Sequence, residues 1–581
     1  MIPRRPSCRP PLRLAAAIAC ASLSATLSPT LHAQAPASPA LGASTPKVKG
    51  AKAGDAAKAA QAAKATTPTA NATRPDPMAH WQQGPFMEVF VRSYQDSDGD
   101  GVGDLKGLIS RLDVLQALGI RGLWLMPIQR SADRDHGYAT TDYFSVEPDY
   151  GSMDDVRTLL KEAHARGIGV IIDHVINHSS HLHPFFQDAL RGGPHCDWYV
   201  WQPQAPQGWD IWGKDPWHAR APLLRQQLPM PREKGQPPEA PGPHYFATFG
   251  APMPDFNFRH PAVVKYHEDV LRRWLDLGLD GFRFDAVPHL VEKDAKDWND
   301  QPESRRLSGH FTRLVHTYPN RYVVCEATAE PAVYGRPEHC GAAFAFGIER
   351  EYVGLAKGDT GAIDRLIDKT RTLTPGMATF ISNHDIFAGP RLWDQVAGDE
   401  AAYKLAATAY LLGPGTPYIY YGEEIGMAGA WGLQGDGPIR SPMSWDNEQP
   451  FAGFSTRQPY RPVSPNRATH HLAAQMKDPA SIWHHYRRLS HLRQAEPALR
   501  SGALGEMRRE GALLAMQRLA PAGQGQDVWV LINAGGQPAS WTPPGPGRWL
   551  SQDWPGGAPQ PVTGGAYQVP ARSSAVWRAG R

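Results

Sequence analysis

The feature that most constrains the fold of this chain is a series of short apolar runs that alternate with amphipathic helical stretches from about residue 84 onward. Two of the helical stretches are residues 154–165 and 263–277. Strands that alternate with helices are typical of parallel βαβ units, and eight such units predict an α/β fold, the closed (β/α)8 TIM barrel. The candidate strands are residues 87–91, 122–126, 169–173, 281–285, 322–326, 342–346, 378–382 and 417–421.

Two other regions depart from the barrel pattern. Residues from about 179 to 254 lie between the third and fourth candidate strands and are rich in Trp, Pro and Gly. They are too long for a plain loop, so they predict a small inserted domain after strand 3. After about residue 500 the helical period disappears, and short apolar segments between Gly/Pro turns predict a C-terminal antiparallel β-sandwich over residues 500–581. The barrel with its insert then spans residues 81–499.

The amino-terminal residues predict export rather than a folded domain. Four arginines among the first 13 residues precede a short apolar stretch, and residues 32–35 carry the A-x-A pattern of signal cleavage, which predicts a signal peptide over residues 1–35. Residues 36–80 are rich in Ala, Thr, Pro and Lys and cannot bury enough apolar surface to offset their ordering entropy, so they predict a disordered linker. We therefore expect a periplasmic or secreted protein, with lipidation at Cys20 as the alternative.

Charge and hydropathy exclude two classes of partner. The formal net charge of the whole chain is +3, but the first 80 residues contribute +8, which leaves the remainder at −5. A mildly acidic body lacks the basic surface that binds nucleic acid. The sequence has no apolar run long enough to span a bilayer. We expect a monomer whose partner is its substrate.

Four short strings, in a fixed order along the chain, carry the candidate chemistry. Each ends one of the candidate strands, and the carboxyl ends of barrel strands meet at the face where active sites form. A single Asp or His at a strand end is usually a helix cap or a structural residue, whereas four such strings together favour a site. The strings are DHVINH at residues 173–178, GFRFDA at 281–286, VCE at 324–326 and FISNHD at 380–385.

Two carboxyl groups in these strings fit the cleavage of a glycosidic bond. That reaction needs one carboxylate to attack the anomeric carbon and one protonated carboxyl to donate to the leaving oxygen. Arg283 lies two residues before Asp285 on the same strand face, where its cation would keep Asp285 ionised. Glu326, on the next strand, would lie about 5 Å from Asp285, the spacing of retaining glycosidases. Sugar hydroxyls could be bound by His178, His384 and Asp385.

In these strings the sequence resembles the alpha-amylase family of glycoside hydrolases. The strings resemble that family's four signature regions, and MPDFN at residues 253–257 resembles a fifth region near the inserted domain. The resemblance covers most of the chain from about residue 84 and implies the same barrel, insert and C-terminal sandwich. It implies that Asp285 is the nucleophile, Glu326 the acid/base and Asp385 the transition-state stabiliser. It also implies sugar-binding roles for Arg283, His178 and His384.

A run of alternating carboxylates, DSDGDGVGD at residues 96–104, resembles a calcium loop. It is not an EF-hand, because the twelfth residue is not the Glu that such a loop requires. The alternative is an acidic surface turn, whereas family members with calcium in a similar loop favour the metal. The oxygen ligands predicted for calcium are the side chains of Asp96, Asp98, Asp100 and Asp104 and the carbonyl of Val102.

The residues after the second candidate strand bear on substrate length. Tyr138 closes the string DHGY and resembles the family's aromatic platform under the cleaved sugar. In exo-acting α-glucosidases of the family, an Asp and an Arg together hold the terminal 4-hydroxyl, and Asp135 and Arg440 match this pair. The alternative is two surface charges or a buried ion pair. Pro288 stands where typical α-amylases have a Lys before His289, and we keep His289 as a candidate for substrate binding.

Together these residues predict a retaining glycosidase of the α-amylase or α-glucosidase type that acts on α-1,4-linked malto-oligosaccharides or starch-derived glucans. Residues 285–290 resemble oligosaccharide-acting members and trehalose synthases, whereas residues 86–92 and 420–427 resemble bacterial α-amylases. A trehalose synthase-like isomerase or transglucosylase is the first alternative. A catalytically inactive carbohydrate-binding relative is the second, although such proteins lose the carboxylates that this chain keeps. The sequence leaves open a disulfide between Cys325 and Cys340.

Overall fold

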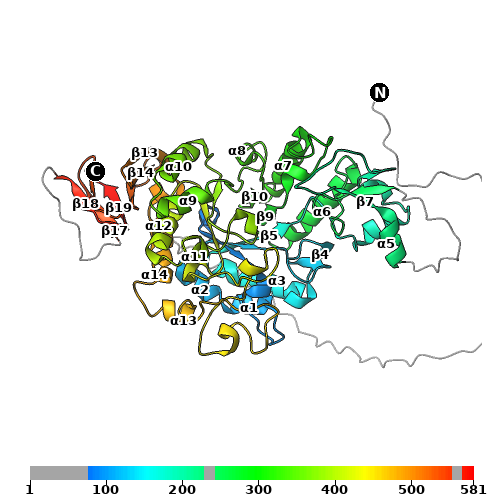
Figure 1. Ribbon diagram of the computed structural model, residues 1–581, viewed down its shortest axis with the longest axis horizontal. Coiled ribbons are helices and arrows are strands. Elements are labelled where there is room, and N and C mark those ends of the chain that lie inside the picture. The colour runs from blue at the N-terminus through cyan, green and yellow to red at the C-terminus, as the bar shows by residue number, and fades with distance from the viewer. Residues whose placement is uncertain (1–75, 228–242, 553–564, 581) are drawn as a thin grey trace, which may run out of the picture. The chain divides into compact units, whose positions relative to one another are not determined.

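The computed structural model of the protein describes residues 76–227, 243–552 and 565–580. The expected signal peptide and all but the last few residues of the expected linker lie outside these described residues. Within them the chain forms a parallel barrel, an insert between two of its strands, and C-terminal antiparallel sheets (Figure 1). The fold class predicted from the sequence is confirmed.

Seven parallel strands form the barrel: β1 Phe86–Val89, β2 Gly122–Leu125, β5 Gly169–His174, β9 Gly281–Phe284, β10 Tyr322–Cys325, β11 Ala378–Thr379 and β12 Thr416–Tyr420. Their spatial order is β10-β9-β5-β2-β1-β12-β11, which leaves β10 and β11 at the edges. Residues of the sixth candidate strand join these edges. Ala343 forms a parallel bridge to Cys325, and Phe344 forms one to Ala378. This segment therefore closes the ring without being a strand itself.

Alternation along the strands sorts the barrel interior into two layers. Toward the amino-terminal ends, the ring of Phe86 stacks on that of Tyr418 with centroids 4.6 Å apart. Toward the carboxyl ends, Asp173 of β5 pairs in register with Arg283 of β9. Residues two apart on a strand point to the same face. Inside the barrel, an aromatic layer therefore lies nearer the amino-terminal ends of the strands, and a charged layer lies nearer their carboxyl ends. The charged layer lies where the candidate site was expected.

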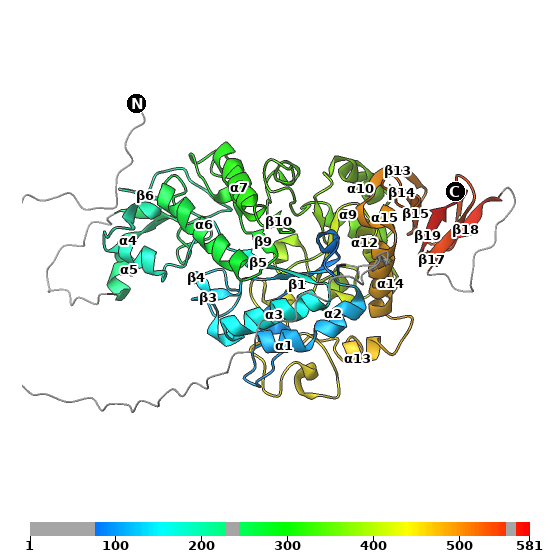
Figure 2. The same ribbon diagram turned by 180° about the vertical axis from the view of Figure 1, so that it is seen from behind.

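Helices cover the outside of the barrel with apolar stripes. The α6 helix, Pro261–Asp276, buries residues at helical spacing that include Val263, Val270 and Trp274. The α3 helix, Met153–Ala165, packs against β5 (Figure 2). None of the helices in the described ranges has the length and apolar character needed to cross a membrane. Further helices are α1 Leu105–Ser110, α2 Leu112–Leu118, α7 Pro302–Val315, α8 Pro331–Tyr334, α9 Glu349–Ala356, α10 Thr360–Thr372, α11 Leu392–Gln395, α12 Glu400–Leu411, α13 Leu472–Gln475, α14 Ile482–Ala495 and α15 Pro497–Ser501.

The insert between β5 and β9 has a small sheet and an apolar core of its own. Buried Ile211 and Phe246 belong to this core, and Trp298 from the connection after β9 packs against it. The three strands of the insert pair antiparallel, with the last of them in the middle. Its elements, which lie within the expected residues 179–254, are α4 Pro184–Leu190, β6 Trp201–Gln202, β7 Trp217–Ala219, α5 Arg220–Gln227 and β8 His244–Phe246. A hairpin of β3 Gln129–Ser131 and β4 Thr140–Val146 follows β2.

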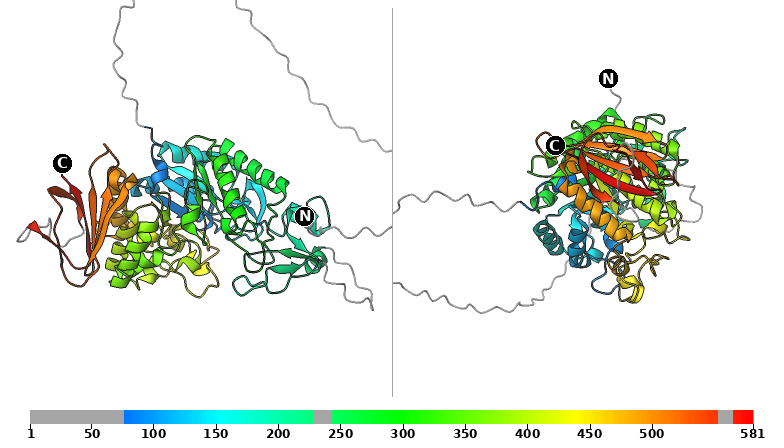
Figure 3. Two further views of the ribbon diagram at one scale, coloured as in Figure 1. Left: turned by 90° about the horizontal axis from the view of Figure 1, so that it is seen from above. Right: turned by 90° about the vertical axis from the view of Figure 1, so that its left-hand side faces the viewer.

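The C-terminal strands are β13 Ala503–Glu510, β14 Leu513–Leu519, β15 Val528–Asn533, β16 Ala539–Trp541, β17 Gly547–Gln552, β18 Tyr567–Val569 and β19 Ser573–Ala579. They form a five-stranded antiparallel sheet, β13-β14-β15-β19-β17, and a two-stranded sheet, β16-β18 (Figure 3). Trp529, Trp541 and Trp577 belong to one buried cluster that joins both sheets, as the predicted sandwich requires. The strands β15 and β19 contact α12, which attaches this region to the barrel.

Candidate active site

One guanidinium group, that of Arg283, lies among three carboxyl groups at the carboxyl ends of the strands. Its Nη1 lies 2.9 Å from both carboxylate oxygens of Asp173 and contacts Oδ1 of Asp285. Its Nη2 lies 2.9 Å from Oε2 of Glu326. These side chains come from β5, from β9, and from the residues directly after β9 and β10, which are neighbouring strands. The structure thus brings the two predicted catalytic carboxyls together with Arg283, and it adds Asp173.

Three carboxyls around one cation make this cluster prone to retain a proton. At most 11% of any of the four side chains is exposed. Burial raises the pKa of Asp173 to about 6 and raises the pKa of Asp285 well above its ordinary value, and the Arg283 cation opposes both shifts. The charge of Glu326 raises both pKa values further. The sequence predicted that the Arg283 cation keeps Asp285 ionised. In the structure the cation offsets only part of the rise in the pKa of Asp285.

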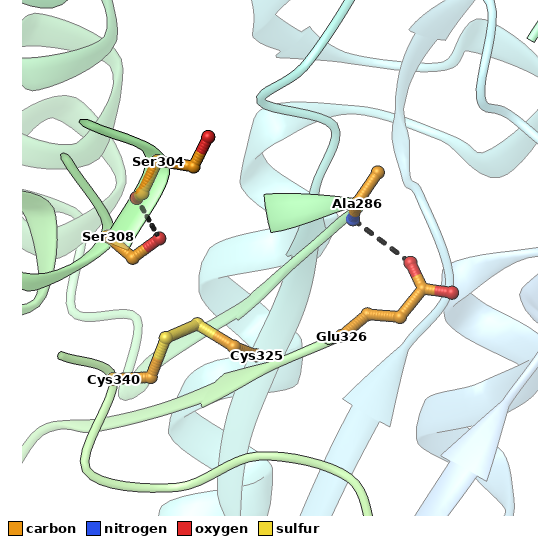
Figure 4. Close-up of a disulfide and its surroundings, with 6 residues drawn as sticks. All are labelled: Ala286, Ser304, Ser308, Cys325, Glu326 and Cys340. Atoms are coloured by element: carbon orange, nitrogen blue, oxygen red, sulfur yellow. Dashed lines mark hydrogen bonds between the residues drawn. A yellow bond between two sulfur atoms is a disulfide. The ribbon is translucent and has the colours of Figure 1, made fainter. Parts of the chain in front are cut away.

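Backbone contacts hold Glu326 beside the end of β9. Its Oε2 accepts a 2.9 Å hydrogen bond from the backbone N–H of Ala286 (Figure 4). Ala286 has a φ of 50°, a left-handed conformation that is unusual for a residue with a side chain. Cys325, directly before Glu326, forms a disulfide with Cys340 (Figure 4). The disulfide that the sequence left open therefore ties the end of β10, directly before Glu326, to the chain just before the segment that closes the barrel.

A second polar group surrounds Asp385, a few residues after β11. The carboxylate of Asp385 lies 3.1 Å from Nη2 of Arg440 and 3.2 Å from Nε2 of His384. The same Nε2 lies 2.6 Å from the hydroxyl of Tyr138, whose ring stacks on the imidazole at 5.5 Å and 13°. The Tyr138 hydroxyl donates a 2.9 Å hydrogen bond to Asp173, which joins the two polar groups. Burial raises the pKa of Asp385 to about 7, and the Arg440 cation opposes that shift.

The expected pairing of Asp135 with Arg440 is replaced by two other pairings. Arg440 lies 2.9 Å from Asp436 as well as 3.1 Å from Asp385. Asp135 is held instead by Arg461, whose Nη2 lies 2.6 Å and 2.7 Å from its two carboxylate oxygens. Asp135 and Arg440 thus each form an ion pair with a residue outside the Asp–Arg pair that the sequence predicted. The parts that Asp135 and Arg440 take in substrate binding remain predictions.

His178 and His289 lie among aromatic rings on another side of the site. The ring of Phe249, from the insert, lies 5.1 Å from that of His178 and 5.6 Å from that of His289. Both ring nitrogens of His178 and Nδ1 of His289 are buried and have no hydrogen-bond partner among the described residues. Burial lowers the pKa of His178 to about 3 and that of His289 to about 4, so both rings are neutral near pH 7. Sugar hydroxyls could satisfy these buried nitrogens.

The expected calcium loop brings three of its four carboxylates together. Oxygens of Asp96, Asp98 and Asp104 all lie within 4.8 Å of one another. Asp100 is outside this group, and its Oδ1 accepts a 2.7 Å hydrogen bond from the N–H of Val102. Each of the three converging carboxylates also accepts at least one hydrogen bond from a nearby backbone N–H group. Three converging carboxylates fit a cation that prefers oxygen ligands, such as calcium, with Asp100 as a departure from the expected set.

Comparison with known proteins bears on the family. Residues 88–502 match the protein family described as alpha amylase, catalytic domain. The chain belongs to the alpha-amylase family. The matched residues include the Arg283 cluster, the Asp385 group and the acidic loop, and the match ends where the C-terminal sheets begin. Membership in this family agrees with the resemblance seen in the sequence strings.

Similar proteins in the family carry names from different reaction classes. The trehalose synthase/amylase TreS of Mycobacterium tuberculosis is 32% identical over 509 residues, which cover 77% of this chain and 80% of that protein. Alpha-amylase 3 of Dictyoglomus thermophilum is 32% identical over 441 residues, which cover 73% of this chain and 80% of that protein. The solved structure of the alpha-amylase from H. orenii has a TM-score of 0.72 at 30% identity, and the likeness covers 86% of this chain and 99% of that one.

Three side chains of the site received no role from the sequence: Asp173, Glu88 and Asp436. Oε1 of buried Glu88 lies 2.6 Å from Nδ1 of His384, on the opposite side of that ring from Tyr138 and Asp385. Glu88 and Asp173 are single charges inside otherwise apolar strands, and a buried charge of this kind usually has a partner or a function. That signal could have found both. Asp436 lies in an irregular segment between elements and gave no comparable signal.

Proposed function

We propose that this alpha-amylase family member cleaves α-1,4-glucosidic bonds of malto-oligosaccharides or starch-derived glucans and retains the anomeric configuration. The observation that carries the proposal is the contact of both Asp285 and Glu326 with the guanidinium group of Arg283. Carboxyls bound to the two amino groups of one guanidinium lie close together, as a retaining mechanism requires. Inverting enzymes instead separate their carboxyls to leave room for a water molecule.

In the proposed reaction, Asp285 attacks the anomeric carbon while Glu326 donates a proton to the glycosidic oxygen. A bond forms between the Asp285 carboxylate and the sugar, and the bond to the leaving oxygen breaks. Glu326, now ionised, then takes a proton from a water molecule whose oxygen attacks the same carbon and releases Asp285. Arg283 offsets the negative charge of the carboxylates in both steps.

The Asp385 group would bind the sugar that becomes attached to Asp285. We propose that the ring of Tyr138 underlies this sugar, and that His384 and Asp385 bond its hydroxyls. Arg440 then acts through Asp385, because its cation keeps that buried carboxyl available in the ionised form. His178, with both ring nitrogens lacking a partner among the described residues, would bond a further hydroxyl.

A second candidate function is that of a trehalose synthase-like isomerase. The identity of 32% over 509 residues to a protein named trehalose synthase/amylase favours it. Such an enzyme uses the same carboxyls, and it differs in whether water or the released sugar accepts the glucosyl group. A catalytically inactive relative is disfavoured, because Asp285, Glu326 and Asp385 are all present.

Three further features complete the proposal. We propose that calcium binds at Asp96, Asp98 and Asp104 and stabilises the loop. Asp96 also accepts a 2.6 Å hydrogen bond from Ser455, so the metal would stabilise a contact between two distant parts of the chain.

We propose that the protein is exported to the periplasm or the exterior, which rests on the signal-like amino terminus. We also propose that it acts as a monomer.

Incubation of the mature protein with maltose, maltotriose and starch, followed by separation of the products, tests the proposed reaction. A hydrolase releases glucose or shorter oligosaccharides from at least one of these substrates. Trehalose as the main product from maltose would instead establish the isomerase. No product from any of the three substrates would contradict both candidate functions. The variant Asp285→Asn under the same conditions controls for contaminating activity.

A further inference from the structure

Trp212 lies exposed at the tip of a tight turn in the insert. Backbone hydrogen bonds of 2.8 Å and 3.0 Å in both directions between Ile211 and Lys214 close this turn. Trp212 and Gly213 both have positive φ, 51° and 82°, as in the two-residue turns that join hairpin strands. This conformation is unfavourable for a residue as large as Trp, and yet Trp212 is 61% exposed. An exposed indole on a strained backbone points to a function.

The indole of Trp212 belongs to a group of rings that extends inward to His178. Its ring lies 5.4 Å from Trp298, 5.5 Å from His289 and 5.8 Å from Phe249. The His289 ring stacks on Trp298 at 5.3 Å and 8°. Phe249 continues the group inward, because it lies 5.1 Å from the ring of His178. We call Trp212, Trp298, Phe249 and His289 the aromatic wall.

The aromatic wall lies on the side of Glu326. His289 ends the short helix η5, Val287–His289, which begins directly after Ala286, and the N–H of Ala286 is bonded to Glu326. Glu326 is also the charged group whose field acts on the His289 ring. In a retaining glycosidase the acid/base donates its proton to the leaving oxygen, so the leaving sugar lies on the acid/base side. The wall therefore borders the space that the leaving sugar occupies.

The wall also offers a polar atom to a ligand. His289 is only 5% exposed, and its Nδ1 has no hydrogen-bond partner among the described residues. A sugar ring has apolar faces that stack on aromatic rings and hydroxyls at its rim that bond to such a nitrogen. The contacts of Trp212 with Trp298 and His289 are edge-to-face, at 88° and 81°, and leave most of the indole uncovered. Stacking surface and unpaired nitrogen thus lie side by side.

We propose that the aromatic wall is a binding subsite for the leaving sugar, which stacks on Trp212 and bonds a hydroxyl to Nδ1 of His289. This inference rests on the proposed function and names the residues that would decide the fate of the glucosyl group. A glucose or malto-oligosaccharide held there after cleavage can act as acceptor. Its hydroxyl oxygen attacks the anomeric carbon, the bond to Asp285 breaks, and Glu326 takes the hydroxyl proton. The wall then favours transfer to a sugar over transfer to water.

Rates on two substrates with the same glucosyl group distinguish a sugar-binding role of Trp212 from a purely structural one. Maltose has a sugar as leaving group, whereas α-glucosyl fluoride releases fluoride and needs no sugar subsite. We expect Trp212→Ala to lower kcat/KM for maltose about tenfold, since loss of one aromatic stacking contact is of that size. The same variant should leave kcat/KM for α-glucosyl fluoride within about twofold of wild type. Trp212→Phe, which keeps a stacking face, should recover most of the activity on maltose.

The transfer reaction gives a second readout. With α-glucosyl fluoride as donor and added glucose as acceptor, Trp212→Ala should release free glucose and form little disaccharide, whereas wild type forms both. Met476→Ala removes an exposed apolar side chain elsewhere and should match wild type in all three assays. An equal loss of activity on both substrates would assign Trp212 a structural role and overturn the inference, and so would an unchanged rate on maltose. A wild-type protein inactive on both substrates would overturn the proposed function itself.

Discussion

On one side of Asp285 the residues around Asp385 are held by ion pairs, whereas on the other side the residues around His289 contact one another through rings. Arg440 bonds to both Asp385 and Asp436, so each charge on the first side has a fixed partner. On the second side, neutral His289 stacks on Trp298 beside the exposed Trp212. In the proposed reaction, the first side would discriminate the positions of sugar hydroxyls, and the second would accept a sugar in more than one orientation.

This difference agrees with the demands of the proposed reaction. The sugar that becomes attached to Asp285 must be placed within a fraction of an ångström, which rigid ion pairs achieve. The leaving sugar only has to be released or returned, and stacking on an indole suffices for that.

The largest effect is expected where the two sides meet, at the carboxyl groups of Asp285 and Glu326, which we propose to be catalytic. Asp285→Asn and Glu326→Gln should each lower turnover of maltose by several orders of magnitude, because each removes one of two obligatory carboxyl groups. Initial rates and thermal unfolding curves measure the loss and confirm that the fold persists. A folded variant that kept more than about a tenth of the wild-type rate would show that its carboxyl has another role.

A smaller but still large effect is expected from the ion-paired side. Arg440→Ala removes the cation that opposes the burial-driven rise in the pKa of Asp385, which is already about 7. Since we propose that Asp385 acts in its ionised form, the acid limb of the pH profile of kcat/KM should move to higher pH, and activity at pH 7 should fall by roughly one to two orders of magnitude. The limb moves in this direction because a carboxyl loses its ionised form as pH falls through its pKa, and that pKa is higher without the cation.

Arg461→Ala is the matched control for that change. Arg461 bonds to Asp135, whose side chain is 35% exposed, so solvent screens the charge that is left alone. We expect the acid limb to stay in place in this variant. If Arg461→Ala moved the limb as far as Arg440→Ala does, the assignment of Arg440 as the cation that controls Asp385 would be wrong. Trp212→Ala, on the ring side, should also leave the limb unmoved.

The smallest effect on activity is expected from the acidic loop, which belongs to neither side. Calcium that binds only the folded protein should raise the melting temperature by a few degrees, and a chelator should remove that rise. Asp98→Ala should abolish the calcium-dependent shift, whereas Asp100→Ala should keep it, because only Asp98 belongs to the converging group. Scanning calorimetry with and without chelator measures both. Equal responses with and without chelator in wild type would remove calcium from the account.

The barrel was predictable from the sequence because its strands are short, mainly apolar runs, as buried parallel strands require. The exception is the sixth segment, where positive φ at Gly341 and Gly347 brackets the chain and only two residues form bridges. This segment lies between β10 and β11 and joins them through single bridges rather than through a run of paired residues. Its apolar sequence resembles that of a strand, so pattern alone could not distinguish the two.

The close approach of Asp285 and Glu326 was predictable because strand ends converge on one face of a barrel, whichever loops follow. The partners of the charges were not. Arg461 lies 326 positions from Asp135 in the chain, and no local pattern links the two. The aromatic wall was missed for the same reason, because Trp212 and His289 come together only when the insert packs beside the loop after β9. Sequence strings thus located the groups that we propose to react, whereas the contacts around them depend on packing between distant segments.

The central claim, that Asp285 and Glu326 act as a retaining pair, is tested most directly by the configuration of the first product. Proton NMR during the first minutes of maltose or maltotriose cleavage distinguishes the two anomers of the newly formed reducing end before they equilibrate. Two successive displacements at the anomeric carbon predict that the α-anomer appears first. A product that appears first as the β-anomer would show a single displacement by water and would contradict the account.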